Sequence, residues 1–156
     1  MNAIIGTHEC KVDAKGRLLL PSPLKKQLPD LQSGFVLKRS IYNTCLELWP
    51  MSEWNLMMQN LNKLNRFVRE NDKFITRFLS GNKLIDIDEV GRILVPKDLI
   101  VFANINKEVV FTSKINIIEI WDKDLYENEQ TFDNEDFAQL AETVMKNFNP
   151  VPDVLS

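Results

Sequence analysis

Two short segments of the chain carry an arginine in the same local pattern. Residues 13–17 read Asp-Ala-Lys-Gly-Arg and residues 88–92 read Asp-Glu-Val-Gly-Arg, and in both places three aliphatic residues and a proline follow. A guanidinium held at a fixed position can form two parallel hydrogen bonds with a phosphate or with the edge of a guanine. Arg17 and Arg92 are therefore candidate nucleic-acid contacts, and Lys15 adds a charge suited to phosphate.

The other residues of the pattern predict how the arginines are held. Glycine readily takes the positive φ that a tight turn needs, and aspartate can accept hydrogen bonds from backbone amides two residues further along. We therefore expect one turn formed by Asp13 and Gly16, and a second formed by Asp88 and Gly91. A single turn of this kind would be an ordinary hairpin with a solvated arginine, so the signal lies in its recurrence.

The recurrence extends beyond the turns. The two turn segments lie 75 positions apart, and Leu46-Glu-Leu-Trp49 recurs as Ile118-Glu-Ile-Trp121 at an offset of 72. Two matches in the same order at nearly the same offset indicate an internal duplication. We expect two copies of a βαβ-type unit that share one core, because a unit of about 75 residues alone would be only marginally stable.

Residue patterns of common enzymes are missing from the sequence. His8 is the only histidine among 156 residues, and no serine lies in a nucleophile-elbow context. Neither the G-x-x-x-x-G-K-[ST] loop nor the G-x-G-x-x-G loop, which bind phosphates, occurs. The sequence therefore predicts no catalytic residue, no metal site and no cofactor.

Several isolated polar residues are more simply explained as structural. We expect His8 to be a half-exposed strand residue, Cys10 and Cys45 to be core thiols, and Glu47 and Glu119 to face outward from strands rather than form a catalytic pair. Two thiols without a secretion signal fit a reducing cytoplasm, and no apolar run approaches the roughly 20 residues that span a bilayer.

Charge is distributed unevenly along the chain. The net charge is −3, but residues 119–142 hold nine acids and one lysine, so the rest of the chain has a net charge of +5. Residues 1–28 hold five basic and two acidic residues. The part that contains the turns is therefore basic, which favours a nucleic-acid partner.

Local patterns predict the elements that position the turns. Apolar periodicity, together with proline and glycine signals, separates strands from helices. The predicted strands are 4–12, 17–20, 35–38, 45–49, 82–87, 92–95, 109–112 and 117–121, and the predicted helices include 70–79, 97–103 and 134–147. Two further helices are expected to begin at Ser22 and Ser52, which would act as N-caps.

Taken together, these segments resemble the MraZ family of bacterial transcriptional regulators of the division and cell-wall gene cluster. The resemblance extends from about residue 5 to residue 126. Its segments are Val12–Pro21, Leu46–Trp54, Arg77–Gly81, Asp88–Arg92, Asn106–Phe111 and Ile118–Asp122.

The resemblance implies an α+β fold in which tandem AbrB-like swapped-hairpin units close into one β-barrel with flanking helices. Residues 5–54 would form the first AbrB-like repeat, 55–80 the connecting helices, 81–126 the second repeat, and 127–156 a C-terminal acidic segment and helix. It also implies a cytoplasmic, nucleoid-associated protein that assembles into a ring-like homo-oligomer. The partner would be double-stranded promoter DNA with repeated elements.

The resemblance also assigns roles to individual residues. In the family the arginine of the first turn contacts DNA, a role that falls here on Arg17, with Arg92 as its repeat partner. Independently of the resemblance, the charge of Lys11, Lys15 and Lys25 suggests that they neutralise phosphates, which is how basic side chains supply most non-specific DNA affinity.

The second turn departs from the first in two ways. It has Glu89 and Val90 where the first has Ala14 and Lys15, and residues 99–103 lack the arginine expected after the second proline. We therefore expect the first turn to dominate DNA binding.

Two functions from different classes follow. The favoured one is a sequence-specific DNA-binding transcriptional regulator, acting as a repressor and without catalytic activity. The alternative is a protein-interaction ring of the same fold that binds no DNA. The basic first 28 residues favour DNA, whereas an enzyme would need a nucleophile, base or metal set that the sequence does not offer.

Overall fold

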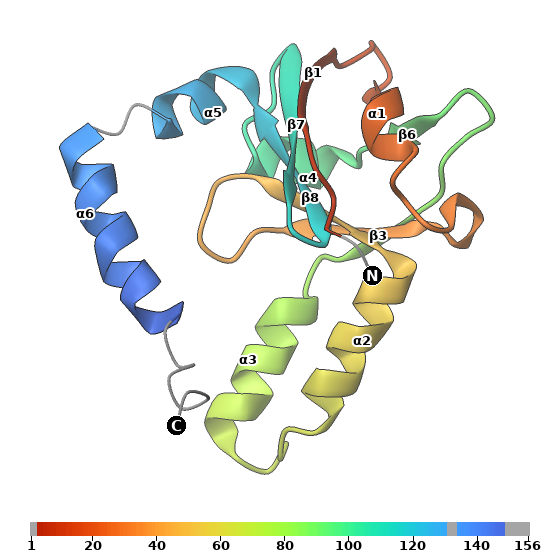
Figure 1. The fold of residues 1–156 in the computed structure, drawn as a ribbon. Coiled ribbons are helices and arrows are strands. Elements are labelled where there is room, and N and C mark those ends of the chain that lie inside the picture. Colours follow the sequence, from red (N-terminus) through yellow and green to blue (C-terminus); the bar gives the residue numbers. More distant parts are fainter. Residues whose placement is uncertain (1–2, 131–133, 149–156) are drawn as a thin grey trace. The chain divides into compact units, whose positions relative to one another are not determined.

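The structure, a computed structural model, describes residues 3–130 and 134–148 (Figure 1). The chain divides into two compact units, residues 1–125 and 126–156, and the first unit contains both turns. The strands are β1 Thr7–Lys11, β2 Arg17–Leu19, β3 Phe35–Arg39, β4 Leu46–Pro50, β5 Lys83–Ile85, β6 Arg92–Leu94, β7 Glu108–Lys114 and β8 Ile117–Asp122. The helices are α1 Ser22–Lys25, α2 Met51–Asn62, α3 Arg69–Leu79, α4 Lys97–Phe102, α5 Lys123–Glu129 and α6 Asn134–Met145, with short 3-10 turns at Leu31–Ser33 and Lys146–Phe148.

The strands form two sheets, and the α+β class is confirmed. One sheet has six strands in the order β1-β7-β8-β4-β3-β5, and the other is a two-stranded ribbon of β2 and β6. Within the described residues β1 and β5 pair on one side only, so the predicted closed barrel is not confirmed. The βαβ-type unit is wrong, because every strand pairing among the described residues is antiparallel, whereas a βαβ unit joins two parallel strands.

The predicted helices are present, but two of them, α1 and α2, start differently from expectation. The N-cap of α1 is Pro21 and that of α2 is Pro50, and neither helix has a side-chain cap. Ser22 and Ser52 lie inside the helices, so the prediction that they act as N-caps is wrong. The fixed φ of proline, here −58° and −59°, already suits the entry to a helix. Helix α5 was not predicted from the sequence.

The ribbon joins the two repeats. Strand β2 of the first repeat pairs with β6 of the second, with Leu18 opposite Ile93. Both side chains are fully buried in a core to which both repeats contribute. Two further bonds extend the pairing: Leu20 N donates to Gly91 O at 2.9 Å, and Val95 N donates to Gly16 O at 3.0 Å. Each strand therefore ends against the turn of the other repeat.

A second, smaller core lies between the sheet and the pair of helices α2 and α3. Trp49 of β4 packs edge-on against Trp54 of α2 and Phe78 of α3, and the last two rings stack at 5.9 Å. Figure 1 shows the two helices extending from the sheet, away from α1 and β6. The helical pair is thus held by aromatic packing and does not contribute to the ribbon.

The two faces of the ribbon should respond differently to truncation. Leu18→Ala is expected to lower the free energy of unfolding by about 2–5 kcal/mol, because it removes a fully buried side chain. Leu19→Ala is the matched control on the same strand, where the side chain is 50% exposed, and should cost about 0.5 kcal/mol or less. Urea denaturation measures both, and equal losses would contradict the assignment of the two faces.

Candidate nucleic-acid interface

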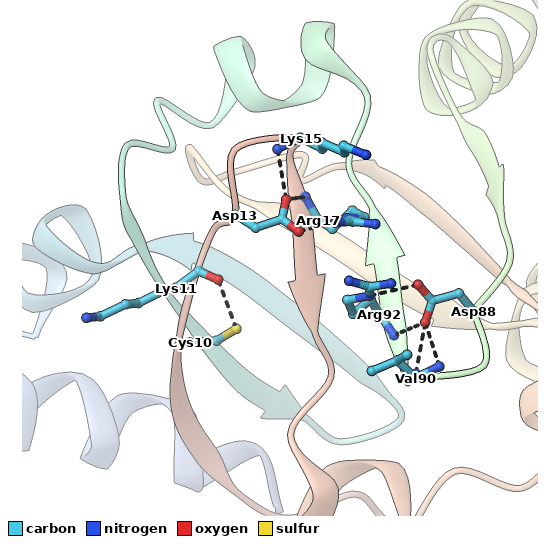
Figure 2. A network of polar contacts seen from close by, with 9 residues as sticks. Cys10, Lys11, Asp13, Lys15, Arg17, Asp88, Val90 and Arg92 are labelled. Atoms are coloured by element: carbon cyan, nitrogen blue, oxygen red, sulfur yellow. Dashed lines mark hydrogen bonds and ion pairs between the residues drawn. The ribbon is translucent and has the colours of Figure 1, made fainter.

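The first turn is held by a single carboxylate. Oδ1 of Asp13 accepts hydrogen bonds from the backbone amides of Lys15 at 2.9 Å and Arg17 at 2.8 Å, and Oδ2 accepts one from Arg17 Nε at 2.7 Å. Gly16 has a φ of +85°, and its amide donates to Asp13 O at 3.0 Å. The aspartate therefore fixes both the turn and the direction in which the arginine leaves it (Figure 2).

The second turn repeats this arrangement residue for residue. Oδ1 of Asp88 accepts from the amides of Val90 at 3.0 Å, Gly91 at 3.0 Å and Arg92 at 2.8 Å. Oδ2 accepts from Arg92 Nε at 2.9 Å, and Gly91 has a φ of +99°. Figure 2 shows the two arginines on neighbouring strands, each beside its own aspartate.

The carboxylates hold the arginines while leaving most of each guanidinium available. A guanidinium has five N–H donors, and in Arg17 and Arg92 only the Nε donor is engaged by the described residues. The side chains are 29% and 31% exposed. The terminal nitrogens can therefore make the paired contacts that a phosphate or a guanine edge accepts.

The same contacts lower the pKa of both aspartates below the ordinary 3.8. The largest cause is the hydrogen bond from the arginine backbone amide, and the guanidinium adds a smaller effect. A lowered folded-state pKa means that the stabilisation is complete above the unfolded-state value and is lost as the pH falls through the folded-state value. Both turns are therefore fully held at neutral pH.

Strand register places both arginines on one face of the ribbon. Arg17 lies opposite Leu94, and Leu19 lies opposite Arg92, whereas the residues between them face the core. Leu19 and Leu94 are 50% and 54% exposed. The outer face of the ribbon thus presents two arginines on one diagonal and two leucines on the other.

The predicted lysines are not all brought together. Lys15 is exposed at the tip of the first turn. Lys11 lies on β1 opposite Glu108, and in Figure 2 its side chain points away from the turn. Lys25 lies at the second turn instead of the first, with its Nζ 3.0 Å from the point that a Cβ on Gly91 would occupy.

The surroundings of the two turns differ in charge. A concavity at the first turn has Lys15 and Lys97 in its lining, with Asp13 as its acid. The concavity at the second turn has Lys25 in its lining together with three acids, Asp86, Asp88 and Glu89. Sequence reasoning missed Lys97, although a basic residue directly after the second proline was an available signal.

The remaining candidate residues have structural roles. His8 is half-buried on β1, as predicted, and Cys45 is buried, whereas Cys10 is only half-buried. Burial raises the pKa of both thiols, that of Cys45 to about 12. No group of three or more metal-binding side chains occurs among the described residues. Within the same part of the chain no helix is long and apolar enough to cross a membrane.

The two glutamates do not face outward, so that prediction is wrong. Glu47 and Glu119 are opposite each other on β4 and β8, and Glu119 is only 7% exposed. Each accepts a hydrogen bond from the indole two residues further on, at 3.0 Å for Trp49 and 2.9 Å for Trp121. The recurring Glu-x-Trp pattern is thus an anchor for a buried tryptophan.

Fold and site together define a class of protein: a small α+β protein with an internal repeat, in which a ribbon shared by both repeats presents two arginines held by aspartates. The chain belongs to the MraZ family. A family model described as "MraZ protein, putative antitoxin-like" matches residues 3–76 and 78–148.

Three similar proteins match the sequence of this chain over nearly the full length of both chains. A protein of Flavobacterium psychrophilum is 62% identical over 150 residues, which are 96% of each chain. One of Christiangramia forsetii is 58% identical over 145 residues, 92% of this chain and 94% of its own. One of Cytophaga hutchinsonii is 35% identical over 142 residues, 91% and 94% of the two chains. All three are named Transcriptional regulator MraZ.

The aspartate should keep a low pKa even without the arginine side chain. In Arg17→Ala the pKa of Asp13 should rise only part of the way towards 3.8, because the backbone amides of residues 15 and 17 remain as donors. Carboxyl-carbon NMR as a function of pH measures this. A return to the ordinary value would show that the guanidinium, and not the backbone, holds the carboxylate.

Proposed function

We propose that the protein is a sequence-specific DNA-binding transcriptional regulator that acts in the cytoplasm on the nucleoid. In this proposal it represses the division and cell-wall gene cluster, as the family resemblance implies. The names of its relatives support transcriptional regulation. The ribbon of β2 and β6 is the DNA-reading surface, and the proposal assigns it no catalytic step and no cofactor.

The observation that carries the proposal is the pair of arginines on one face of a stiff ribbon. The major groove of B-DNA admits a two-stranded β-ribbon, and arginine bound to guanine is its commonest specific contact. Arg17 and Arg92 have their Nε atoms bound to aspartates at 2.7 and 2.9 Å, so only the outer nitrogens face a ligand. Exposed Leu19 and Leu94 beside them suit apolar contact with thymine methyl groups.

We also infer that the ribbon and the six-stranded sheet correspond to the swapped-hairpin barrel implied by the resemblance. Strand β2 pairs with β6 of the other repeat, although β1 is its neighbour along the chain. An exchange of strands between repeats is what a swapped hairpin requires. The exchange also brings the two arginines within one small surface.

A single subunit offers too few base contacts for tight binding. Each good bidentate contact is worth about 1–3 kcal/mol, whereas a Kd of about 10⁻⁸ M corresponds to about 11 kcal/mol. We therefore propose that several subunits, assembled as a closed ring-like homo-oligomer, bind one promoter together. Linked sites can raise affinity by orders of magnitude without any new contact.

The two arginines should differ in their contribution to binding. Arg17→Ala should reduce affinity for DNA from upstream of the protein's own gene by at least about fivefold, the loss of one bidentate contact, and more if several subunits bind. Arg92→Ala should cost less, because acids surround the second turn. Arg69→Ala on α3 is the exposed control. Equal losses from Arg17→Ala and Arg92→Ala, in folded variants, would contradict the asymmetry.

Binding should also depend on the number of DNA elements. We expect light scattering to find a homo-oligomer larger than a dimer, and fluorescence anisotropy to find tight binding only to DNA with more than one copy of the recognised element. A monomer that binds one copy as tightly as three would refute the shared-binding mechanism. A protein that forms the ring but binds none of the DNA would favour the protein-interaction alternative.

A further inference from the structure

We propose that Lys97 of the second repeat and Lys15 of the first repeat together bind one phosphate of the DNA backbone beside the first turn. The inference rests on the proposed function and deepens it, since it adds a residue from the other repeat to the site. The sequence alone gives no reason to group these lysines, because 82 positions separate them.

The ribbon brings the second repeat to the first turn. Val95 N donates to Gly16 O at 3.0 Å, directly after β6 ends. Pro96 follows as the N-cap of α4, and Lys97 is the first residue of that helix. The chain therefore passes the turn at Gly16, and Lys97 lies two residues beyond the hydrogen bond that fixes this passage.

Both lysines belong to the lining of a single concavity of about 440 Å³ at this turn. Other parts of its lining are apolar, with contributions from Ala14, Pro96 and Ile100. Ile100 Cδ1 lies 3.5 Å from the point that a Cβ on Gly16 would occupy. A lining that combines two lysines with apolar side chains suits a phosphate and the deoxyribose next to it, because the sugar can contact the apolar residues.

Neither lysine has its charge compensated by a described acid. Asp13, the acid in the lining, already accepts the two backbone amides and Arg17 Nε. Asp98, next to Lys97 in the chain, is paired with Lys83 at 3.4 Å. Lys15 and Lys97 are both exposed. Because neither ammonium group has an ion-pair partner among the described residues, both are available to bind an external anion.

The second turn does not present an equivalent pair of lysines among the described residues, so we assign the phosphate site to the first turn alone. With the repeat offset of 75, Val90 corresponds to Lys15 and Ser22 corresponds to Lys97. Lys25 reaches that turn, but its concavity is also lined by Asp86, Asp88 and Glu89. Lys97 therefore has no basic counterpart at the corresponding position of the first repeat, which is Ser22.

The salt dependence of DNA binding by the full-length protein tests this inference. Lys15→Ala and Lys97→Ala should each weaken binding to the upstream DNA, measured by anisotropy between about 50 and 200 mM salt, but each should largely keep the slope of log affinity against log salt, because the remaining lysine still neutralises the phosphate. Because the two lysines bind one phosphate, only the double variant should lower the slope, by about 0.9 for each engaged subunit and not by about twice that amount. Lys63→Ala, an equal change of charge at the end of α2, is the matched control and should leave both the affinity and the slope unchanged.

Other outcomes separate the inference from the proposed function. If Lys97→Ala, folded by circular dichroism, binds DNA as tightly as the wild type and the double variant keeps the slope of Lys15→Ala, while Arg17→Ala loses binding, the inference is wrong and the proposed function stands. If the wild type binds no DNA, or its slope is flat, the proposed function fails with it. Calorimetry with sodium phosphate adds one more outcome: loss of phosphate binding in Lys97→Ala, with no change in DNA affinity, would show that the site takes the free anion and would overturn its assignment to DNA.

Discussion

The pairing of β2 with β6 is the contact on which the rest of the site depends. Two reciprocal hydrogen bonds, Leu20 N to Gly91 O and Val95 N to Gly16 O, tie each strand to the turn of the other repeat. Leu18 and Ile93, opposite each other beneath the ribbon, are fully buried and anchor it to the shared core. Neither repeat could position its arginine alone, because a strand of three residues needs a partner and an apolar face to be stable.

The aspartate in each turn holds the arginine in one orientation on the surface of the ribbon before any ligand binds. Arginine ordinarily loses much rotamer freedom when it binds, and a side chain already held in place loses less. Asp13 holds the backbone and the Nε of Arg17 at once, so the orientation of the guanidinium follows from the turn. The backbone amide of Arg17 is also the main reason that the pKa of this carboxylate lies below the ordinary 3.8, so the carboxylate stays charged to a lower pH than a free aspartate does. The arginine held by an aspartate is a small, rigid group that occurs in both turns. The proposed binding of DNA through repeated weak contacts requires such a group.

Local features could be predicted from the sequence, whereas contacts between the repeats could not. The Asp and Gly of each turn define their own backbone geometry, so both turns and the strands that flank them follow from a few residues. The placement of Lys25 at the second turn and Lys97 at the first depends on which strands pair, and periodicity carries no information about that. The burial of Glu47 and Glu119 escapes prediction for a related reason: the local pattern does not show that each carboxylate has both a tryptophan indole and a lysine ammonium as partners. At the starts of α1 and α2 the N-cap positions are occupied by Pro21 and Pro50, so Ser22 and Ser52 do not act as caps.

The central claim is that DNA lies on the ribbon, with the first turn as its main contact. The other basic stretch, residues 60–83, runs from the end of α2 through all of α3 and offers a competing surface. Hydrogen–deuterium exchange of the full-length protein, with and without DNA from upstream of its gene, compares the two directly. The account predicts slower exchange in peptides that contain residues 11–20, with a smaller effect at residues 88–97 and none in α2 or α3. Slower exchange confined to residues 60–83, with both turns unchanged, would contradict it.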